Sequence, residues 1–202
     1  MAQDYSDDPG VRWMLAYQAG DEAAFDELVG RYSPQAYALM TRFLGRRPGR
    51  EDLVQEVFLR IVRARDRYQA TARFSTYLYR IVFNLAVNET QRLTGTGQLS
   101  LDQPIGGVDS GSVLGDLQAG DAPEPSTELE RDDVVHAVRA AIARLPEQQR
   151  MALILAKYHD TPYAEIAEVL GSSEKAIKSL VHRARESLRE WLAPFLRQGD
   201  LS

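Results

Sequence analysis

Apolar residues recur in adjacent pairs four positions apart through two stretches of the first half of the chain. Residues 51–63 carry Leu53, Val54, Val57, Phe58, Ile61 and Val62, and residues 74–88 carry Phe74, Tyr77, Leu78, Ile81, Val82 and Leu85. This spacing places apolar side chains along one face of an α-helix. Weaker patterns over residues 11–29, interrupted near Gly20, and over residues 33–44 predict further helices. Four such helices can close a small bundle.

The periodic pattern stops between residues 94 and 126, where the sequence is rich in Gly, Ser, Asp and Pro. That composition is typical of a flexible linker. Three helical patterns follow, over residues 127–145, 147–158 and 161–192, and no stretch alternates convincingly as a strand. The sequence therefore predicts an all-α fold with two small helical domains, residues 1–93 and 127–202, joined by a flexible acidic linker, residues 94–126.

Charge is distributed unevenly along the chain. Residues 1–30 carry one Arg against seven acidic residues, residues 31–93 carry twelve Arg against five, and residues 94–133 carry one Arg against nine. The net charge of −5 for the whole chain hides this pattern. A basic segment between acidic ones indicates selective contact with a polyanion.

Several classes of protein fit the sequence poorly. The chain has no cysteine, so it can form neither a disulfide nor a zinc–thiolate site. No apolar run approaches the roughly 20 residues that span a bilayer, and the acidic start MAQDYSDDPG is unlike a signal peptide, so we expect a cytoplasmic protein without membrane insertion. Scattered histidines and the lack of a phosphate-binding loop sequence argue against an enzyme, a metal site or a cofactor.

The stretch of residues 161–192, TPYAEIAEVLGSSEKAIKSLVHRARESLREWL, predicts two helices separated by a tight turn. Thr161 is expected to cap the first helix and Pro162 to open it. A small residue, a glycine four positions later and apolar anchors in the second helix have the spacing of a helix-turn-helix motif. The residues at these positions are Ala167, Gly171, Ile177 and Leu180.

The second of these helices presents a row of hydrogen-bond donors outside its apolar stripe. They are Ser172, Ser173, Lys175, Lys178, Ser179, His182, Arg183 and Arg185. Such side chains suit phosphates and base edges, so we expect this helix to read DNA. A plain helical hairpin with a solvated face remains the alternative. Residues 73–92 also interleave aromatic side chains with arginines, which fits stacking on unpaired bases and core packing equally well.

These segments together resemble bacterial sigma factors of the extracytoplasmic-function type. The resemblance rests on EDLVQEVFLRIVR (51–63), FSTYLYRIVFNLAVNETQR (74–92) and residues 145–188, and it covers both predicted domains in the family's order. It implies a subunit that binds core RNA polymerase and directs it to promoter DNA. It also implies that residues 1–93 bind polymerase and open the minus-ten element, and that residues 127–202 recognise the minus-thirty-five element.

The resemblance implies roles for individual residues. Those at the family's contact with the polymerase clamp are Asp52, Leu53, Gln55, Glu56 and Phe58. Those at the minus-ten element are Tyr68, Arg73, Phe74 and Ser75 in a loop over residues 68–75 that captures a flipped base, with Arg80, Asn84 and Asn88 on the helix that follows. The eight donors of the helix-turn-helix fall where the family reads the minus-thirty-five element in the major groove.

The chain departs from the family pattern in two places. Tyr77 stands where many relatives have Trp, and the basic cluster that follows the fourth helix in relatives is reduced to NETQR. Two other functions stay open from the residues: a helix-turn-helix regulator that acts without polymerase, and a helical protein-interaction module. The family commonly has an anti-sigma factor, so we expect one as a further partner.

Overall fold

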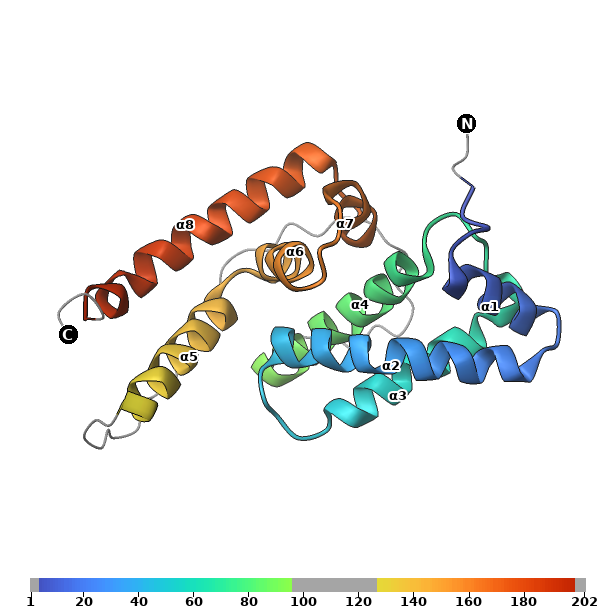
Figure 1. The fold of residues 1–202 in the computed structure, drawn as a ribbon, viewed down its shortest axis with the longest axis horizontal. Helices are drawn as coiled ribbons and strands as arrows, with labels where there is room; N and C mark the ends of the chain where they lie inside the picture. Colours follow the sequence, from blue (N-terminus) through green and yellow to red (C-terminus); the bar gives the residue numbers. More distant parts are fainter. Residues whose placement is uncertain (1–3, 96–126, 199–202) are drawn as a thin grey trace.

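The structure is a computed structural model that describes residues 4–95 and 127–198, and these residues are helical with short connections (Figure 1). In chain order the elements are α1 (Pro9–Gln18), α2 (Glu22–Leu44), α3 (Arg50–Arg63), the 3-10 helix η1 (Arg65–Arg67), α4 (Phe74–Thr94), α5 (Thr127–Arg144), α6 (Glu147–Tyr158), α7 (Tyr163–Leu170) and α8 (Glu174–Gln198). The predicted all-α, two-domain fold is confirmed. Residues 96–126 of the predicted acidic linker lie outside the described residues.

Two aspartates set the first helix boundaries. The Asp8 carboxylate accepts from the Val11 main-chain N–H over 2.9 Å at the start of α1, and Asp21 accepts from Ala23 over 3.1 Å at the start of α2. Such caps satisfy N–H groups that have no partner within the helix. Gly20 separates the two helices with a φ of 108°, a conformation that favours glycine. The predicted break near Gly20 is therefore confirmed.

Helix α2 runs without interruption through a point where we predicted a boundary. The expectation of separate helices over residues 11–29 and 33–44 is wrong, because α2 continues across Pro34. A proline inside a helix removes one hydrogen bond and costs about 3 kcal/mol. Leu28, Tyr32 and Leu39 are nevertheless buried on both sides of Pro34, so packing of one continuous apolar face outweighs that cost.

The helix-turn-helix forms as predicted around its glycine. Gly171 adopts the left-handed conformation with φ 59° and ψ 40° and ends α7. The Ser173 hydroxyl then accepts from the Ala176 N–H over 3.2 Å and caps α8. The prediction for Thr161 is wrong: Pro162 occupies the cap position of α7, and the Thr161 hydroxyl points back to the His159 carbonyl.

The first domain packs α1, α3 and α4 around the long α2, and the second packs α5, α6 and α7 against α8. Figure 1 shows α7 beside one end of α4, and the two helices are in contact. Helix α6 also touches α2. One cluster of buried apolar side chains runs through both domains, so the two helical groups are docked together. Across residues 4–95 and 127–198 no helix has the length and hydropathy that a membrane span needs.

Candidate promoter and polymerase interfaces

The exposed face of α8 carries the predicted DNA-reading residues. Ile177, Leu180 and Val181 are buried against the rest of the domain. All eight predicted donors are exposed: Ser172, Ser173, Lys175, Lys178, Ser179, His182, Arg183 and Arg185. The apolar anchors thus fix α8 in the domain and leave a polar face free for contact. Sequence and structure agree on the orientation of this helix.

Two acidic side chains interrupt this polar face. Lys178 Nζ lies 2.7 Å from Glu174 Oε1, and His182 Nε2 lies 3.2 Å from Glu186 Oε1. The hydrogen bond to Glu174 raises the pKa of Lys178 above its ordinary value. Among the described residues, Lys175, Arg183 and Arg185 form no ion pair. The cations that can meet DNA without breaking an ion pair therefore lie at the start and in the middle of α8.

The loop before α4 is anchored by buried rings at both ends. Tyr68 is 7% exposed and Phe74 is fully buried, and their ring centroids lie 6.5 Å apart. Tyr77 packs edge-on against Tyr68 at 5.2 Å. Burial raises the pKa of the Tyr68 hydroxyl. We predicted Tyr68 and Phe74 as part of the minus-ten surface, but the structure places both rings in the core, so only residues between them are open to a base.

The first turns of α4 continue this surface. Arg73 is exposed, Ser75 is half-buried, and Asn84 and Asn88 are exposed one turn apart. Arg80 lies on the same helix and donates from Nη2 to the Glu168 carbonyl over 2.9 Å. Two of these predicted polar residues already contact α7, Arg80 through this carbonyl and Arg73 through Glu165, whose Oε1 lies 3.2 Å from Arg73 Nε.

The outer face of α3 carries the predicted polymerase contacts in part. Asp52 and Gln55 are exposed, whereas Glu56 accepts from Arg60 over 3.0 Å and Arg63 over 3.4 Å. Leu53 is half-buried, and the Phe58 ring is buried edge-on against Phe25 with centroids 6.4 Å apart. The structure therefore places Phe58 in the core, where it packs α3 against α2 and is not available for contact with polymerase.

Sequence reasoning missed two apolar residues on this outer face. Leu59 is 48% exposed and Val62 is 37% exposed, next to the charged side chains of α3. Leu59 follows Gln55 by four positions, so the helical period alone could have placed it on the polar face. Val62 was assigned to the buried stripe, and the structure exposes it. Exposed aliphatic side chains beside charges are common in protein interfaces.

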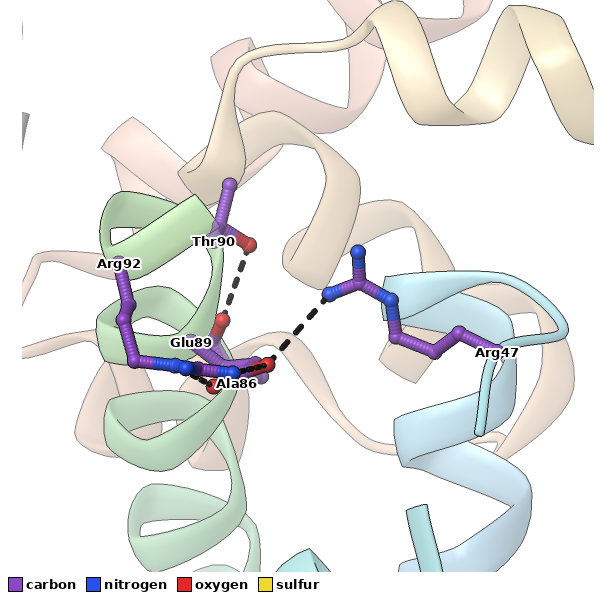
Figure 2. Close-up of polar contacts among 5 residues, drawn as sticks. All are labelled: Arg47, Ala86, Glu89, Thr90 and Arg92. Atoms are coloured by element: carbon purple, nitrogen blue, oxygen red, sulfur yellow. Dashed lines mark hydrogen bonds and ion pairs between the residues drawn. The ribbon is translucent and has the colours of Figure 1, made fainter. Parts of the chain in front are cut away.

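A second missed feature lies at the far end of α4. Arg92 donates twice to the Glu89 carboxylate, over 2.8 and 2.9 Å, and Arg47 Nη1 from the α2–α3 loop lies 3.8 Å from the same carboxylate (Figure 2). The hydrogen bond from Arg92 lowers the pKa of Glu89. The fold thus brings a second arginine to the end of α4, where the local sequence is short of positive charge.

Comparison with known proteins identifies the family. Residues 28–95 match the family described as Sigma-70 region 2, and residues 136–188 match Sigma-70, region 4. The RNA polymerase sigma-H factor of Pseudomonas aeruginosa is 33% identical over 182 residues, which cover 90% of this chain and 93% of the relative. The chain belongs to the sigma-70 family. The ECF RNA polymerase sigma-E factor of Haemophilus influenzae is 30% identical to this sigma factor, and the match covers 89% of this chain and 93% of the relative. This similarity supports the extracytoplasmic-function type.

Solved structures support the fold of this sigma factor. CnrH, solved in complex with the cytosolic domain of CnrY, superposes with a TM-score of 0.63 at 23% identity, over 93% of this chain and 99% of that chain. RpoE from Bartonella quintana, solved with the anti-sigma factor NepR, superposes with a TM-score of 0.57 at 21% identity, over 84% of this chain and 96% of that chain. Both share the two-domain helical fold.

The family membership decides between the functions that the residues left open. The protein is a promoter-specificity subunit of RNA polymerase: it binds the core enzyme and directs transcription initiation at a set of promoters. A helix-turn-helix regulator that acts without polymerase is not favoured. The family is one of transcription initiation factors rather than enzymes.

Proposed function

We propose that this sigma factor recognises promoters in two steps with two separate surfaces. The exposed face of α8 docks in the duplex minus-thirty-five element, and the loop before α4 holds a base from the opened minus-ten strand. The observation that carries the proposal is the loop of residues 69–73, in which Gln69, Thr71 and Arg73 are exposed and which buried rings hold in place at both ends. A pre-ordered loop loses little conformational entropy when it binds a base.

The duplex step uses the start of α8 for sequence and its middle for the backbone. Ser172, Ser173 and Lys175 lie where the reading helix of a helix-turn-helix meets base edges. Arg183 and Arg185 lie two to three turns further along, where side chains meet phosphates. Because these arginines have no ion pair within the part of the chain that the structure describes, they bring their full charge to DNA.

The strand-opening step relies on polar groups of the loop. Flipping a base out of the duplex costs a few kcal/mol, which contacts to the flipped base must offset. Since the Tyr68 and Phe74 rings are buried, hydrogen bonds from Gln69, Thr71 and Arg73 supply these contacts. Asn84 and Asn88 extend the surface along α4, where they can contact neighbouring nucleotides of the opened DNA strand.

The polymerase grip lies on the outer face of α3. Asp52 and Gln55 provide polar contacts, and Leu59 adds exposed apolar area beside them. This combination of an apolar centre with a charged rim is the usual make-up of a protein interface. Helices α2 and α4 support α3 from behind, so the face is presented on a rigid element.

An anti-sigma factor is a further proposed partner. CnrH and RpoE were each solved with another protein bound, the cytosolic domain of CnrY and the anti-sigma factor NepR. We propose that this sigma factor also binds an anti-sigma factor. The sigma factor acts in the cytoplasm, because bacterial promoter DNA and polymerase are found there, and it contributes binding rather than catalysis.

The strand-opening step can be tested on a promoter selected by the wild-type holoenzyme from a random duplex library. Gln69→Ala with Thr71→Ala should leave closed-complex binding intact and reduce permanganate reactivity of the minus-ten thymines at least about tenfold. Asp66→Ala, on exposed η1 beside the loop, is the matched control and should melt DNA normally. Normal melting by the loop variant would reduce the loop to a connection between helices.

A further inference from the structure

The start of the loop before α4 is attached to α1 by one side chain. Gln18, the last residue of α1, donates from its amide Nε2 to the Arg65 carbonyl over 2.9 Å and to the Tyr68 carbonyl over 3.3 Å. The amide nitrogen carries two N–H groups, so it can serve both acceptors at once. Both carbonyls lie where the chain leaves α3 and η1, and main-chain groups there need partners from outside the helix. Gln18 therefore fastens the loop to a helix that precedes it by 50 residues.

The same helix seats the other end of this loop. Gly10, near the start of α1, lies directly against Phe74, the first residue of α4. A Cβ at Gly10 would come within 2.6 Å of the Phe74 Cβ, so the two helices are as close here as a glycine allows. Val11 and Met14 of α1 are fully buried, which makes the helix itself a fixed part of the first domain. One packed helix thus holds residues 69–73 at both ends.

The hydrogen bond at Tyr68 sets the direction in which the loop continues. The Tyr68 carbonyl and the Gln69 N–H belong to one trans peptide plane and point in opposite directions. Because the carbonyl faces Gln18, the Gln69 N–H points away from α1. The Thr71 N–H then donates to the Gln69 carbonyl over 2.9 Å, which closes a three-residue turn around the half-buried Ala70. Gln69 and Thr71 stand exposed on either side of it, and their presentation follows from the Tyr68 peptide plane.

The side chain of Arg65 adds a weaker attachment of the same turn. Its guanidinium lies 4.3 Å from the centre of the Tyr17 ring, and Nη1 lies 2.9 Å from Glu22 Oε1. The Glu22 side chain is 72% exposed, and an ion pair at such a site contributes little because water screens it. It also holds only the side chain of Arg65, whereas Gln18 holds the carbonyl. The partly buried hydrogen bonds of Gln18 are therefore the contacts that fix the main chain at the start of the loop.

We propose that Gln18 is a positioning residue for base capture. Through the carbonyls of Arg65 and Tyr68 it holds the loop of residues 69–73 in the shape that receives the flipped minus-ten base. The inference rests on the proposed function, in which side chains of this loop bind that base. It adds a role for α1, which precedes the match to Sigma-70 region 2 at residues 28–95. Gln18 does not touch the base itself and acts through the main chain.

The physical basis of this role is preorganisation. A loop that already has its bound shape loses little conformational entropy when the base enters. Without the donors of Gln18 the loop takes this shape for only part of the time, and the apparent affinity for the base falls by that fraction. Gln18 lies on neither the exposed face of α8 nor the outer face of α3. We therefore expect strand opening to depend on it, and duplex binding and polymerase binding to be independent of it.

The test compares four variants of the full chain. Gln18→Met keeps the length of the side chain and removes both donors. Gln18→Asn is a second variant in case the thioether alters helical content, because its amide is one methylene too short to reach the carbonyls. Gln18→Lys is the rescue variant, since an ammonium group has three N–H donors on a stem of sufficient length. Gln148→Met makes the same chemical change at an exposed position of α6 and is the matched control.

The first readout is hydrogen exchange of the Thr71 main-chain N–H in the free chain, followed by NMR. Exchange requires the turn that Thr71 closes on Gln69 to open. Gln18→Met and Gln18→Asn should raise the exchange rate about fivefold or more, because each lost hydrogen bond shifts such an equilibrium by about two- to tenfold. Gln18→Lys should restore slow exchange, and Gln148→Met should exchange like the unchanged protein.

The second readout is strand opening by the holoenzyme on a promoter that carries 2-aminopurine in the minus-ten element. The fluorescence of this base rises when it or its neighbour leaves the stack, and the responsive position is found first by replacing each minus-ten adenine in turn. Gln18→Met should slow the rise about fivefold or more, while affinities for core polymerase and for the closed promoter complex stay within about twofold. A general loss of stability would instead reduce opening and both affinities together.

Two results overturn the proposal. Equal exchange and opening rates in Gln18→Met and Gln148→Met mean that Gln18 does not hold the loop. A defect that Gln18→Lys shares with Gln18→Met means that packing of the amide, and not its hydrogen bonds, matters at this position. Failure of the proposed function gives a different result: Thr71 exchanges faster in Gln18→Met, yet the promoter opens at the normal rate, because the loop is held by Gln18 but receives no base.

Discussion

The Tyr79 hydroxyl of α4 lies 3.1 Å from Nδ1 of His159 at the end of α6. The contact joins the two domains in the middle of their interface, and the Tyr79 hydroxyl also donates to Gln35 Oε1 over 3.2 Å. Nε2 of His159 is buried without a hydrogen-bond partner among the described residues. Burial and the nearby Arg42 lower the pKa of His159, which Asp160 opposes. The docked interface thus accommodates a neutral imidazole and disfavours an imidazolium.

Acidification should therefore loosen the docking of the two domains. Because the docked form lowers the pKa of His159, the released form binds the proton more readily, and docking weakens as the pH falls below the ordinary histidine value near 6.5. The distance between spin labels on cysteines introduced at Asp26 of α2 and Glu190 of α8, both exposed, should lengthen as the pH is lowered from about 8 to about 5.5. His159→Phe keeps a ring in the interface and should make the distance independent of pH.

His182→Gln is the control for this effect. His182 is exposed on α8, away from the domain interface, so its loss should leave the pH response unchanged. If His159→Phe and the unchanged protein open over the same pH range, another group controls the docking.

The helical period determined most of this fold in advance. The pairs of apolar residues in α3 and α4 predicted the buried faces, and Gly171 with its neighbours predicted the turn of the helix-turn-helix. The unbroken α2 was missed because Ser33 and Pro34 resemble a helix start, and local chemistry does not show that residues on both sides bury the same face. Tertiary packing decided that point.

Site residues could be predicted from the sequence where their only requirement is exposure on the polar face of a helix. The donors of α8 follow from the position of the apolar stripe. The burial of Tyr68 and Phe74 did not follow, since aromatic residues near arginines fit a base-stacking surface and a core equally well. The Thr76 hydroxyl donates to Glu165, which is 89 residues away, so no local pattern could have paired them.

A methyl group added at Gly10 should destabilise the first domain. A Cβ there would come within 2.6 Å of the Phe74 Cβ and would also strike the Tyr32 hydroxyl, and neither can move away because both rings are packed. Overpacking of this kind costs about 1–3 kcal/mol. Urea unfolding of Gly10→Ala should show that loss. Gly30→Ala, within α2 and with open space around the site, should instead stabilise the protein by up to about 1 kcal/mol.

The two arginines at the end of α4 should bind promoter phosphates in the holoenzyme. Arg47 and Arg92 flank Glu89, so three charges leave a net positive site where relatives carry a basic cluster (Figure 2). Each phosphate contact contributes about 0.9 to the slope of log affinity against log salt. Arg92→Ala should flatten the slope by about 1, and Arg12→Ala, at an exposed position of α1, should not change it. Equal slopes for all three proteins would remove Arg92 from the DNA interface.

Reversal of charge on α3 should weaken holoenzyme assembly. Asp52 is exposed on the first turn of α3, where we propose that polymerase donates hydrogen bonds to its carboxylate. Asp52→Arg would place a positive charge there instead. Like charges across an interface cost several kcal/mol, so affinity for core polymerase should fall about 100-fold or more. Asp26→Arg makes the same change at an exposed position of α2 and should bind normally. Helical content should match in both variants; undiminished binding of Asp52→Arg would place the grip elsewhere.

The last prediction separates sequence reading from backbone contact along α8. Lys175 at the start of the helix and Arg183 two turns later are both exposed and lie outside the stripe of Ile177, Leu180 and Val181, so neither substitution should disturb the core. Lys175→Ala should cost about 1–3 kcal/mol on the preferred promoter and relax sequence choice at one position.

Arg183→Ala should instead weaken binding to all promoters alike and flatten the salt dependence by about one unit of slope, because a phosphate contact carries no sequence information. The measurement is promoter affinity of the holoenzyme at several salt concentrations, on the preferred site and on variants of its minus-thirty-five element. Lys178→Ala is a useful third protein: since Lys178 is already paired with Glu174 at 2.7 Å, its loss should have a smaller effect than either. If Lys175→Ala and Arg183→Ala both bind like the unchanged protein at every salt concentration, the exposed face of α8 does not read DNA.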